Sequence, residues 1–347
     1  MALAIVLSAL PGPAAALDIK PQFDSSIAKL AQASQIETAF NRAAGVFEAN
    51  FTDPATVNIN VSWGKVNNHS LGSGTLGASW VNWWTAGSYS QTKAWLSSVA
   101  LTAQDRTALA NLPAKTPAGN RFEIPYAEAK ALGLRAANAS GPDGYVGFGL
   151  TPAKYTFNDS TGVATGTYDF LGIAEHEISE VLGRLSGFDT GGSPGYAYPF
   201  DLFRYAAPRT PTYGYRTAAY FSIDAGTTNL GKFNLGSGDK SDWVSASTSK
   251  DAQEAMLYPH IVLGLSTADL TALDVIGWDG LGTGTVIAKN GTGSSGGQGS
   301  AAVPAPPMLP TFCLTALGLG LYRRRDRKRQ TSRHAGYREI IASLVQH

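Results

Sequence analysis

The chain contains one cysteine and five histidines in 347 residues. A single cysteine excludes an intrachain disulfide and a zinc site built from several thiolates. A strong excess of basic charge is also missing from most of the chain. Residues 323–347 hold 8 of the 27 Lys/Arg and 2 of the 26 Asp/Glu, so the remainder has 19 basic and 24 acidic residues, a net charge of −5. This acidic body lacks the clustered basic surface that binds phosphate backbones, and we expect no nucleic-acid partner.

The N-terminal end, residues 1–16, is predicted to be a secretory signal peptide. A short apolar run, Ala2–Leu10, is followed by Pro-Gly-Pro and by small residues that end at Ala16. This order is typical of a signal peptide with its cleavage site, and the run is too short to span a bilayer. No Lys or Arg precedes the run, so a buried N-terminal strand is the alternative. We expect the protein to be exported.

The C-terminal end is predicted to be directed to a membrane. Residues 282–302 are rich in Gly, Ser and Thr and form a linker, because they cannot bury enough apolar surface to fold. Residues 303–329 contain Val-Pro-Ala-Pro, an apolar stretch at 308–322 and then an Arg/Lys cluster. Such a cluster stays on the cytoplasmic side when the apolar stretch inserts. Residues 330–347 form a basic tail.

The order within residues 303–329 resembles the PEP-CTERM sorting signal of Gram-negative bacteria. Ala305 stands in place of the family's glutamate, and the basic tail follows where the family's sequences end. The resemblance implies an exosortase-like sorting enzyme as a partner and a place in the cell envelope or outside the cell. Before processing, residues 308–322 would anchor the chain in the inner membrane. An ordinary C-terminal anchor is the alternative.

The body between the ends, residues 17–281, is predicted to fold as an α+β domain. It belongs to a chain with 44% hydrophobic and 15% charged residues, which is enough apolar surface for a substantial core. Hydrophobic periodicity, caps and glycines predict the elements. Helical regions are expected at 34–50, 91–110, 170–182 and 266–277, and strands at 57–63 and 145–150. Ser34, Thr102 and Asp169 are the expected helix caps.

The pattern with the most chemical information is His176-Glu177-Ile178-Ser179-Glu180, within the predicted helix 170–182. At about 100° per residue, His176 and Glu180 lie one turn apart on one face and can bind one ion, while Glu177 borders that face. This is the geometry of the H-E-x-x-H zinc motif with glutamate in place of the second histidine, and carboxylate oxygen is an accepted zinc ligand. A helix whose glutamates form a solvated acidic face is the alternative.

This helix resembles the active-site helix of metzincin-type zinc metalloproteases, in which a glycine three residues after the second ligand ends the helix, as Gly183 does. With Phe200–Tyr205, Asp239–Trp243 and Leu265–Asp279, it more closely resembles an uncharacterised bacterial family of predicted zinc metalloproteases that often carry PEP-CTERM segments. The resemblance covers about residues 36–279.

The resemblance implies a zincin-like or metzincin-like catalytic domain with a mixed sheet, an active-site helix, bound zinc and a protein or peptide substrate. Met256, in the segment Ala255–Pro259, resembles the methionine of the turn under a metzincin metal. A core methionine in a turn is the alternative.

The third metal ligand is not evident, because Ser186 stands where metzincins have their third ligand. We expect Asp201, since a carboxylate within the apolar run Tyr198–Phe203 is costly unless it is paired or binds a metal. A salt bridge to Arg184 or Arg204 is the alternative.

Other residues remain candidates for the third ligand. Asp189 is nearest to the motif but lies among glycines, as turn aspartates do. His260 follows Pro259, next to the methionine turn. His69, in a segment rich in Asn and Ser, is expected to be an exposed loop residue.

These features predict a secreted or cell-envelope zinc-dependent endopeptidase with Glu177 as general base. We expect strand 145–150 to bind an extended peptide at its edge. The alternative is a non-catalytic extracellular surface or matrix protein with a zincin-like fold, whose glutamates are structural or bind calcium together with Gly236–Asp239 and Asp242. A carbohydrate-binding module is a third possibility. It would use Trp63, Trp80, Trp83 and Trp84.

Overall fold

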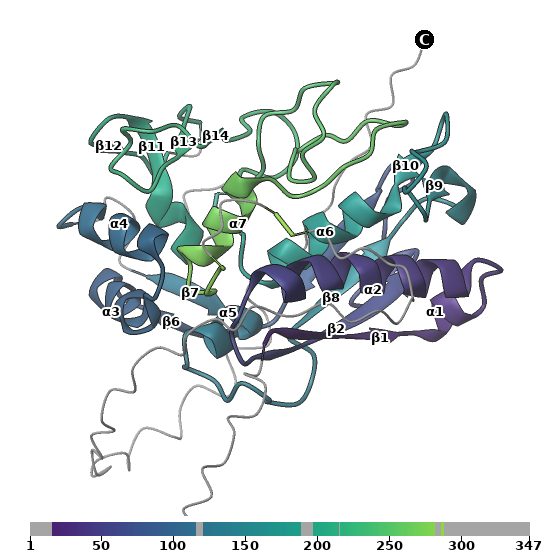
Figure 1. Ribbon diagram of the computed structural model, residues 1–347, viewed down its shortest axis with the longest axis horizontal. Helices are drawn as coiled ribbons and strands as arrows, with labels where there is room; N and C mark the ends of the chain where they lie inside the picture. The colour runs from purple at the N-terminus through teal and green to yellow at the C-terminus, as the bar shows by residue number, and fades with distance from the viewer. Residues whose placement is uncertain (1–15, 116–120, 189–196, 215, 282–285, 288–347) are drawn as a thin grey trace, which may run out of the picture. The chain divides into compact units, whose positions relative to one another are not determined.

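The main sheet of the protein is mixed and has four strands in the order β1, β2, β8 and β5 (Figure 1). The computed structural model describes residues 16–115, 121–188, 197–214, 216–281 and 286–287. The strands are β1 (Asp18–Phe23), β2 (Thr56–Trp63), β8 (Gly144–Phe148) and β5 (Gly77–Val81). The first three run parallel, and β5 is antiparallel to β8. The predicted α+β architecture with a mixed sheet is therefore confirmed.

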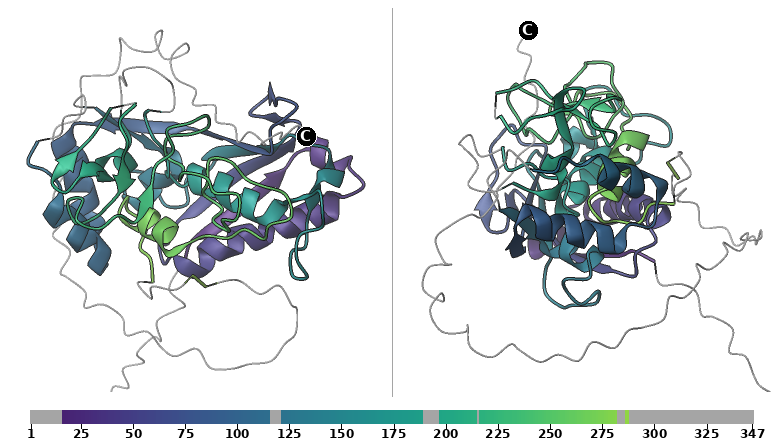
Figure 2. Two further views of the ribbon diagram at one scale, coloured as in Figure 1. Left: turned by 90° about the horizontal axis from the view of Figure 1, so that it is seen from above. Right: turned by 90° about the vertical axis from the view of Figure 1, so that its left-hand side faces the viewer.

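Two helices, α2 (Ala33–Asn50) and α6 (Phe170–Val181), pack side by side against this sheet (Figure 1). A loop-rich segment, from strand β11 (Arg204–Ala207) to helix α7 (Thr267–Asp274), lies on the other side of α6 (Figure 2). Every residue of α6 is buried, its charged residues included. The alternative of a solvated acidic face is therefore wrong, because a helix covered on both sides has no face in water.

Helix α6 begins after the cap and ends before the glycine that the sequence predicts. Asp169 caps the helix by accepting a hydrogen bond from the Leu171 N–H at 3.1 Å. Gly183 follows the last turn with a φ of +116°. A Cβ at Gly183 would lie 2.6 Å from Oε2 of Glu128, so both the backbone conformation and the packing require glycine there.

The other predicted helices are present with shifted ends. The second helical region is two helices, α3 (Tyr89–Val99) and α4 (Ala103–Asn111), and Thr102 caps the latter as expected. The closing helix is α7 (Thr267–Asp274). Ser34 is inside α2 rather than at its N-cap, because the helix begins one residue earlier.

The remaining elements are short. Two further helices are α1 (Ser25–Ala28) and α5 (Tyr126–Ala131), with 3-10 turns at Pro152–Lys154 and Pro199–Phe203. Three strand pairs are β3 (Lys65–Val66) with β4 (His69–Ser70), β6 (Trp83–Gly87) with β7 (Phe122–Pro125), and β9 (Tyr155–Thr156) with β10 (Tyr168–Asp169). A small antiparallel sheet has the order β12 (Thr210–Pro211), β11 (Arg204–Ala207), β13 (Tyr220–Phe221) and β14 (Gly231–Lys232).

Strand β8 lies inside the main sheet, so the predicted pairing of a peptide with the edge of strand 145–150 is wrong. Its neighbours β2 and β5 pair with both of its sides. Its glycines serve internal packing instead. A Cβ at Gly147 would lie 2.2 Å from the Lys65 carbonyl oxygen, and one at Gly144 would lie 2.8 Å from Val181.

The predicted targeting segments lie outside the described residues, except for Ala16 and residues 286–287 of the linker. The backbone of Ile287 exchanges two hydrogen bonds with the Asn50 side chain, at 2.8 and 3.0 Å. Within the described ranges, none of the helices is long and apolar enough to cross a membrane.

Glu128, on α5 beneath the end of α6, predicts a pH-dependent stability. Its carboxylate is fully buried without a hydrogen-bond partner, and burial raises its pKa well above the ordinary value of 4.5. The folded protein therefore keeps a proton that the unfolded chain releases, so stability falls as pH rises from about 4.5 toward the folded pKa.

We expect Glu128→Gln, which cannot ionise, to raise the melting temperature more at pH 8 than at pH 5. Thermal unfolding at both pH values measures this difference, with Glu37→Gln on the partly exposed side of α2 as the control. An equal shift at the two pH values would contradict the assignment.

Candidate metal centre

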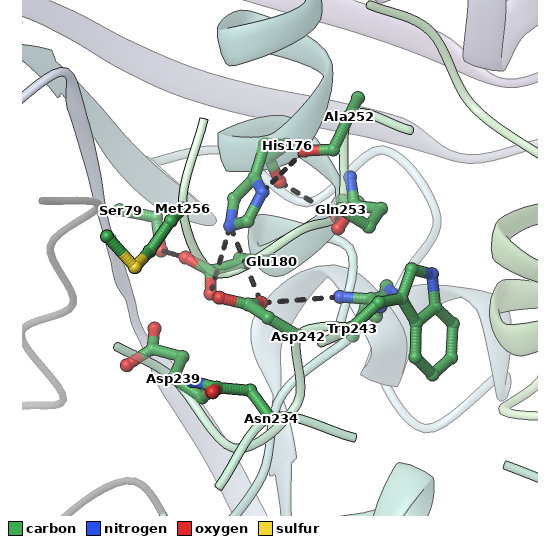
Figure 3. Close-up of polar contacts among 12 residues, drawn as sticks. Ser79, His176, Glu180, Asn234, Asp239, Asp242, Trp243, Ala252, Gln253 and Met256 are labelled. Atoms are coloured by element: carbon green, nitrogen blue, oxygen red, sulfur yellow. Dashed lines mark hydrogen bonds and ion pairs between the residues drawn. The ribbon is translucent and has the colours of Figure 1, made fainter. Parts of the chain in front are cut away.

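Three buried side chains converge between α6 and the loop that follows β14: His176, Glu180 and Asp242 (Figure 3). Their exposed fractions are 0%, 1% and 2%. Nε2 of His176 lies 3.6 Å from Oδ1 of Asp242 and 4.0 Å from Oε1 of Glu180. Ligand atoms around a tetrahedral zinc lie roughly 3.3–3.6 Å apart when each is about 2.0–2.2 Å from the ion. The three ligand atoms lie within 4.8 Å of one another, slightly wider than this range, so the group could hold a metal ion after a small contraction.

The His176 ring is held in the tautomer that a metal ligand needs. Nδ1 lies 2.8 Å from the Ala252 carbonyl oxygen, which can only accept, so Nδ1 carries the proton. Nε2 has no hydrogen-bond partner. Burial lowers the pKa of the imidazole and keeps it neutral. A lone pair on Nε2 therefore faces the carboxylates of Glu180 and Asp242, and a backbone carbonyl behind the ring is a frequent partner of metal-binding histidines.

Glu180 is oriented from the main sheet. The hydroxyl of Ser79, on strand β5, donates a hydrogen bond of 2.6 Å to Oε2 of Glu180 (Figure 3). The other oxygen, Oε1, is the atom that lies toward His176. The hydrogen bond thus leaves one oxygen of Glu180 directed at the shared centre.

Asp242 is accompanied by a buried cation. NH1 of Arg184 lies 3.6 Å from Oδ1 of Asp242, and NH2 lies 3.9 Å from Asp269. The guanidinium also lies over the Trp243 ring at 4.5 Å from its centroid. Arg184 therefore partly offsets the negative charge of the group, and its carboxylate partners are Asp242 and Asp269.

Glu177 lies next to this group, but its carboxylate has different surroundings from those of Glu180. It is fully buried, and within the described residues no N–H or hydroxyl donor reaches either carboxylate oxygen, although the group lies close enough to Glu180 to share a proton with it. Oε1 faces Gly77 of β5, where a Cβ would lie 2.5 Å away. Burial, followed by the nearby charge of Glu180, raises the pKa of Glu177 well above its ordinary value. A raised pKa makes the ionised Glu177 carboxylate a stronger base than an ordinary glutamate.

Asp201, the expected third ligand, has another role. Its oxygens accept hydrogen bonds from the Ser186 hydroxyl at 2.6 Å and from the N–H groups of Gly187 and Tyr198, both at 2.9 Å. These donors compensate its burial, and they tie the segment after α6 to the 3-10 turn Pro199–Phe203. Asp242, and not Asp201, therefore lies with His176 and Glu180 as the third candidate metal ligand.

Of the other candidates, His260 and His69 do not join the group. Asp189 lies outside the described residues. His260 is exposed, and its Nδ1 is 2.6 Å from the Val163 carbonyl oxygen. His69 is exposed as expected, stacked on Trp80 at 4.6 Å.

The predicted calcium ligands around Asp239 surround a lysine instead. The Lys240 ammonium donates to the carbonyl oxygens of Gly236 and Gly238, so a built-in cation satisfies oxygens that calcium would need. Of the four tryptophans considered for carbohydrate binding, Trp84 is the exposed one, at 45%.

Met256 follows the segment that carries Ala252. Its backbone N–H donates to the Ser245 hydroxyl at 2.7 Å. The position of Met256 beneath a metal ion therefore stays a prediction.

From the sequence, Asp242 was identified only as part of the family resemblance and as a possible calcium ligand. No local periodicity marks it, because it lies in a loop far along the chain from α6. The Arg184 side chain and the Ala252 carbonyl were likewise not predictable as parts of the group. Comparisons of the chain with protein-family models, with curated proteins and with solved structures found no match, so the interpretation of the site depends on its own geometry.

Proposed function

We propose that this protein is a zinc-dependent endopeptidase in which His176, Glu180 and Asp242 hold the ion and Glu177 is the general base. The observation that carries the proposal is the buried lone pair of His176 Nε2, which faces two carboxylates and has no hydrogen-bond donor. The ligand oxygens of Glu180 and Asp242 lie within 4.8 Å of each other. Two like unit charges at about that distance repel each other by roughly 3.5 kcal/mol at an effective dielectric constant of about 20. A divalent cation would turn this arrangement into an attractive one.

The donor set favours zinc among the common divalent ions. Zinc accepts imidazole nitrogen together with carboxylate oxygen, and three protein ligands leave a fourth position for water or substrate. Calcium prefers six to eight oxygen ligands, and magnesium prefers octahedral oxygen. One nitrogen and two carboxylates fit neither preference.

Zinc and Glu177 would then have separate roles in hydrolysis. Zinc, when bound, would polarise the scissile carbonyl and make a water more acidic. Glu177 would take a proton from the attacking water and deliver it to the leaving amine. Its position beside Glu180, and the absence of an N–H or hydroxyl donor to its oxygens within the described residues, support this assignment.

A second candidate is a non-catalytic surface or matrix protein with a structural metal. The burial of all three ligands favours it, because structural zinc sites are closed whereas catalytic sites keep an open position. Peptide hydrolysis would require the loops over α6 to admit a substrate. The two candidates differ in one respect, since only the peptidase needs the Glu177 carboxylate.

We also propose that the protein is exported and held in the cell envelope through residues 308–322, with an exosortase-like partner. The signal-like N-terminus and the sorting-like C-terminus support this proposal. Mass spectrometry of the mature N-terminus from a Gram-negative host would test it, and an intact Met1 would contradict it.

Metal content and activity together test the main proposal. Elemental mass spectrometry of the purified full chain is expected to find one zinc per chain, and an unfolded protein substrate is expected to be cut in a chelator-sensitive way. Zinc without hydrolysis would favour the structural alternative. A chain that binds no zinc after reconstitution would contradict both.

A further inference from the structure

We propose that strand β5 decides which glutamate of α6 is the metal ligand and which is the base. Ser79 would assign Glu180 to the metal, and Gly77 would leave Glu177 to act on the proton. This inference rests on the proposed function and adds two positioning residues to it.

Ser79 is the residue of the main sheet that holds Glu180. It is fully buried in β5, opposite Val146 of β8, so its backbone is fixed by the sheet. Its hydroxyl donates to one oxygen of Glu180 at 2.6 Å. A carboxylate with one oxygen bonded in this way has its plane and its second oxygen fixed, which is what a metal ligand requires.

Gly77 faces the same helix two residues earlier, because side chains on a strand alternate between faces. A Cβ there would lie 2.5 Å from Oε1 of Glu177 and 2.9 Å from Ile173. The missing side chain makes room for the Glu177 carboxylate and offers it no donor. Within the described residues, Glu177 therefore receives no hydrogen-bond donor of the kind that Ser79 provides to Glu180.

The contrast matters because the two glutamates are chemically alike and three residues apart on one helix. Both are buried against the same strand. The difference lies in what β5 presents to each, a hydroxyl to Glu180 and a gap to Glu177. Without these contacts, either glutamate could turn toward the ion. Strand β5 would therefore determine which glutamate binds the ion, which the helix motif alone does not.

The first test compares Ser79→Thr with Ser79→Val in the full chain. The two side chains have nearly the same shape, but only threonine keeps the hydroxyl. We expect Ser79→Thr to bind zinc within a few-fold of the wild type, and Ser79→Val to bind it about 10- to 100-fold more weakly, as for lost partners of metal ligands. Competition with a chromophoric chelator measures the dissociation constants.

Ser79→Ala adds no bulk and should weaken zinc binding like Ser79→Val. Ser62→Ala is the matched control, since Ser62 is a buried serine on β2 whose hydroxyl bonds the Lys65 carbonyl. Equal zinc affinity for the Thr and Val variants would overturn the role of Ser79. A wild-type chain without zinc affinity would instead overturn the proposed function.

The second test is Gly77→Ala, with Gly74→Ala as control because a Cβ at Gly74 meets nothing within 4 Å. We expect Gly77→Ala to keep stoichiometric zinc while peptide hydrolysis falls at least about 100-fold, because Glu177 is displaced and the ligands are not. Loss of zinc together with activity, or full activity, would overturn the role of Gly77.

Discussion

Glu177→Gln is expected to keep one zinc per chain while peptide hydrolysis falls by about 10²- to 10⁴-fold, the usual contribution of a general base. Glutamine has nearly the same shape but cannot accept the proton. The ligands His176, Glu180 and Asp242 remain in place. Initial rates at saturating substrate, together with zinc content on the same preparation, measure the effect.

Glu175→Gln is the matched control for this prediction. Glu175 is also a buried glutamate of α6, and burial raises its pKa as well, but it is not part of the metal group. We expect this variant to retain hydrolysis. If Glu177→Gln hydrolysed peptides as fast as the wild type while zinc stayed bound, Glu177 would not be the general base.

Removal of a ligand is expected to abolish stoichiometric zinc binding, with Asp242→Asn as the informative variant. The substitution keeps the side-chain volume and removes the negative charge of the ligand oxygen. His176→Ala should give the same result, since it removes the nitrogen that faces both carboxylates. Elemental mass spectrometry after dialysis reads the zinc content directly.

Asp201→Asn should behave in the opposite way. Its carboxylate accepts hydrogen bonds from Ser186, Gly187 and Tyr198, and an amide NH₂ cannot accept them, so a loss of about 1–3 kcal/mol in unfolding free energy is expected with zinc retained. Thermal unfolding beside metal analysis separates the two aspartates. Zinc loss in Asp201→Asn with zinc retention in Asp242→Asn would restore Asp201 as the ligand.

The helix that carries the motif was predictable because its determinants are local. The Asp169 cap, the hydrophobic spacing and the Gly183 stop all act within a few residues, and each does so in the structure. The same holds for Thr102, which caps α4. The N-cap of α2 is Gln32, two residues before Ser34, which is a shift of the size expected at helix ends.

The third ligand was not predictable by the same reasoning. Burial of Asp201 was inferred correctly, but a buried carboxylate is stabilised by a metal or by N–H and O–H donors equally well. The sequence cannot distinguish these partners. Asp242 becomes a candidate only because the loop after β14 lies against α6.

By itself, the sequence determined the motif helix, the mixed α+β class and the residues His176, Glu177 and Glu180 as one chemical unit, since helical spacing places them without knowledge of the rest of the chain. The tertiary structure decided that the helix is covered on both sides, that Asp242 completes the group, and that Ser79 and Gly77 of β5 meet the two glutamates differently. Those contacts join residues far apart along the chain, and packing and hydrogen bonding bring them together where local periodicity gives no signal.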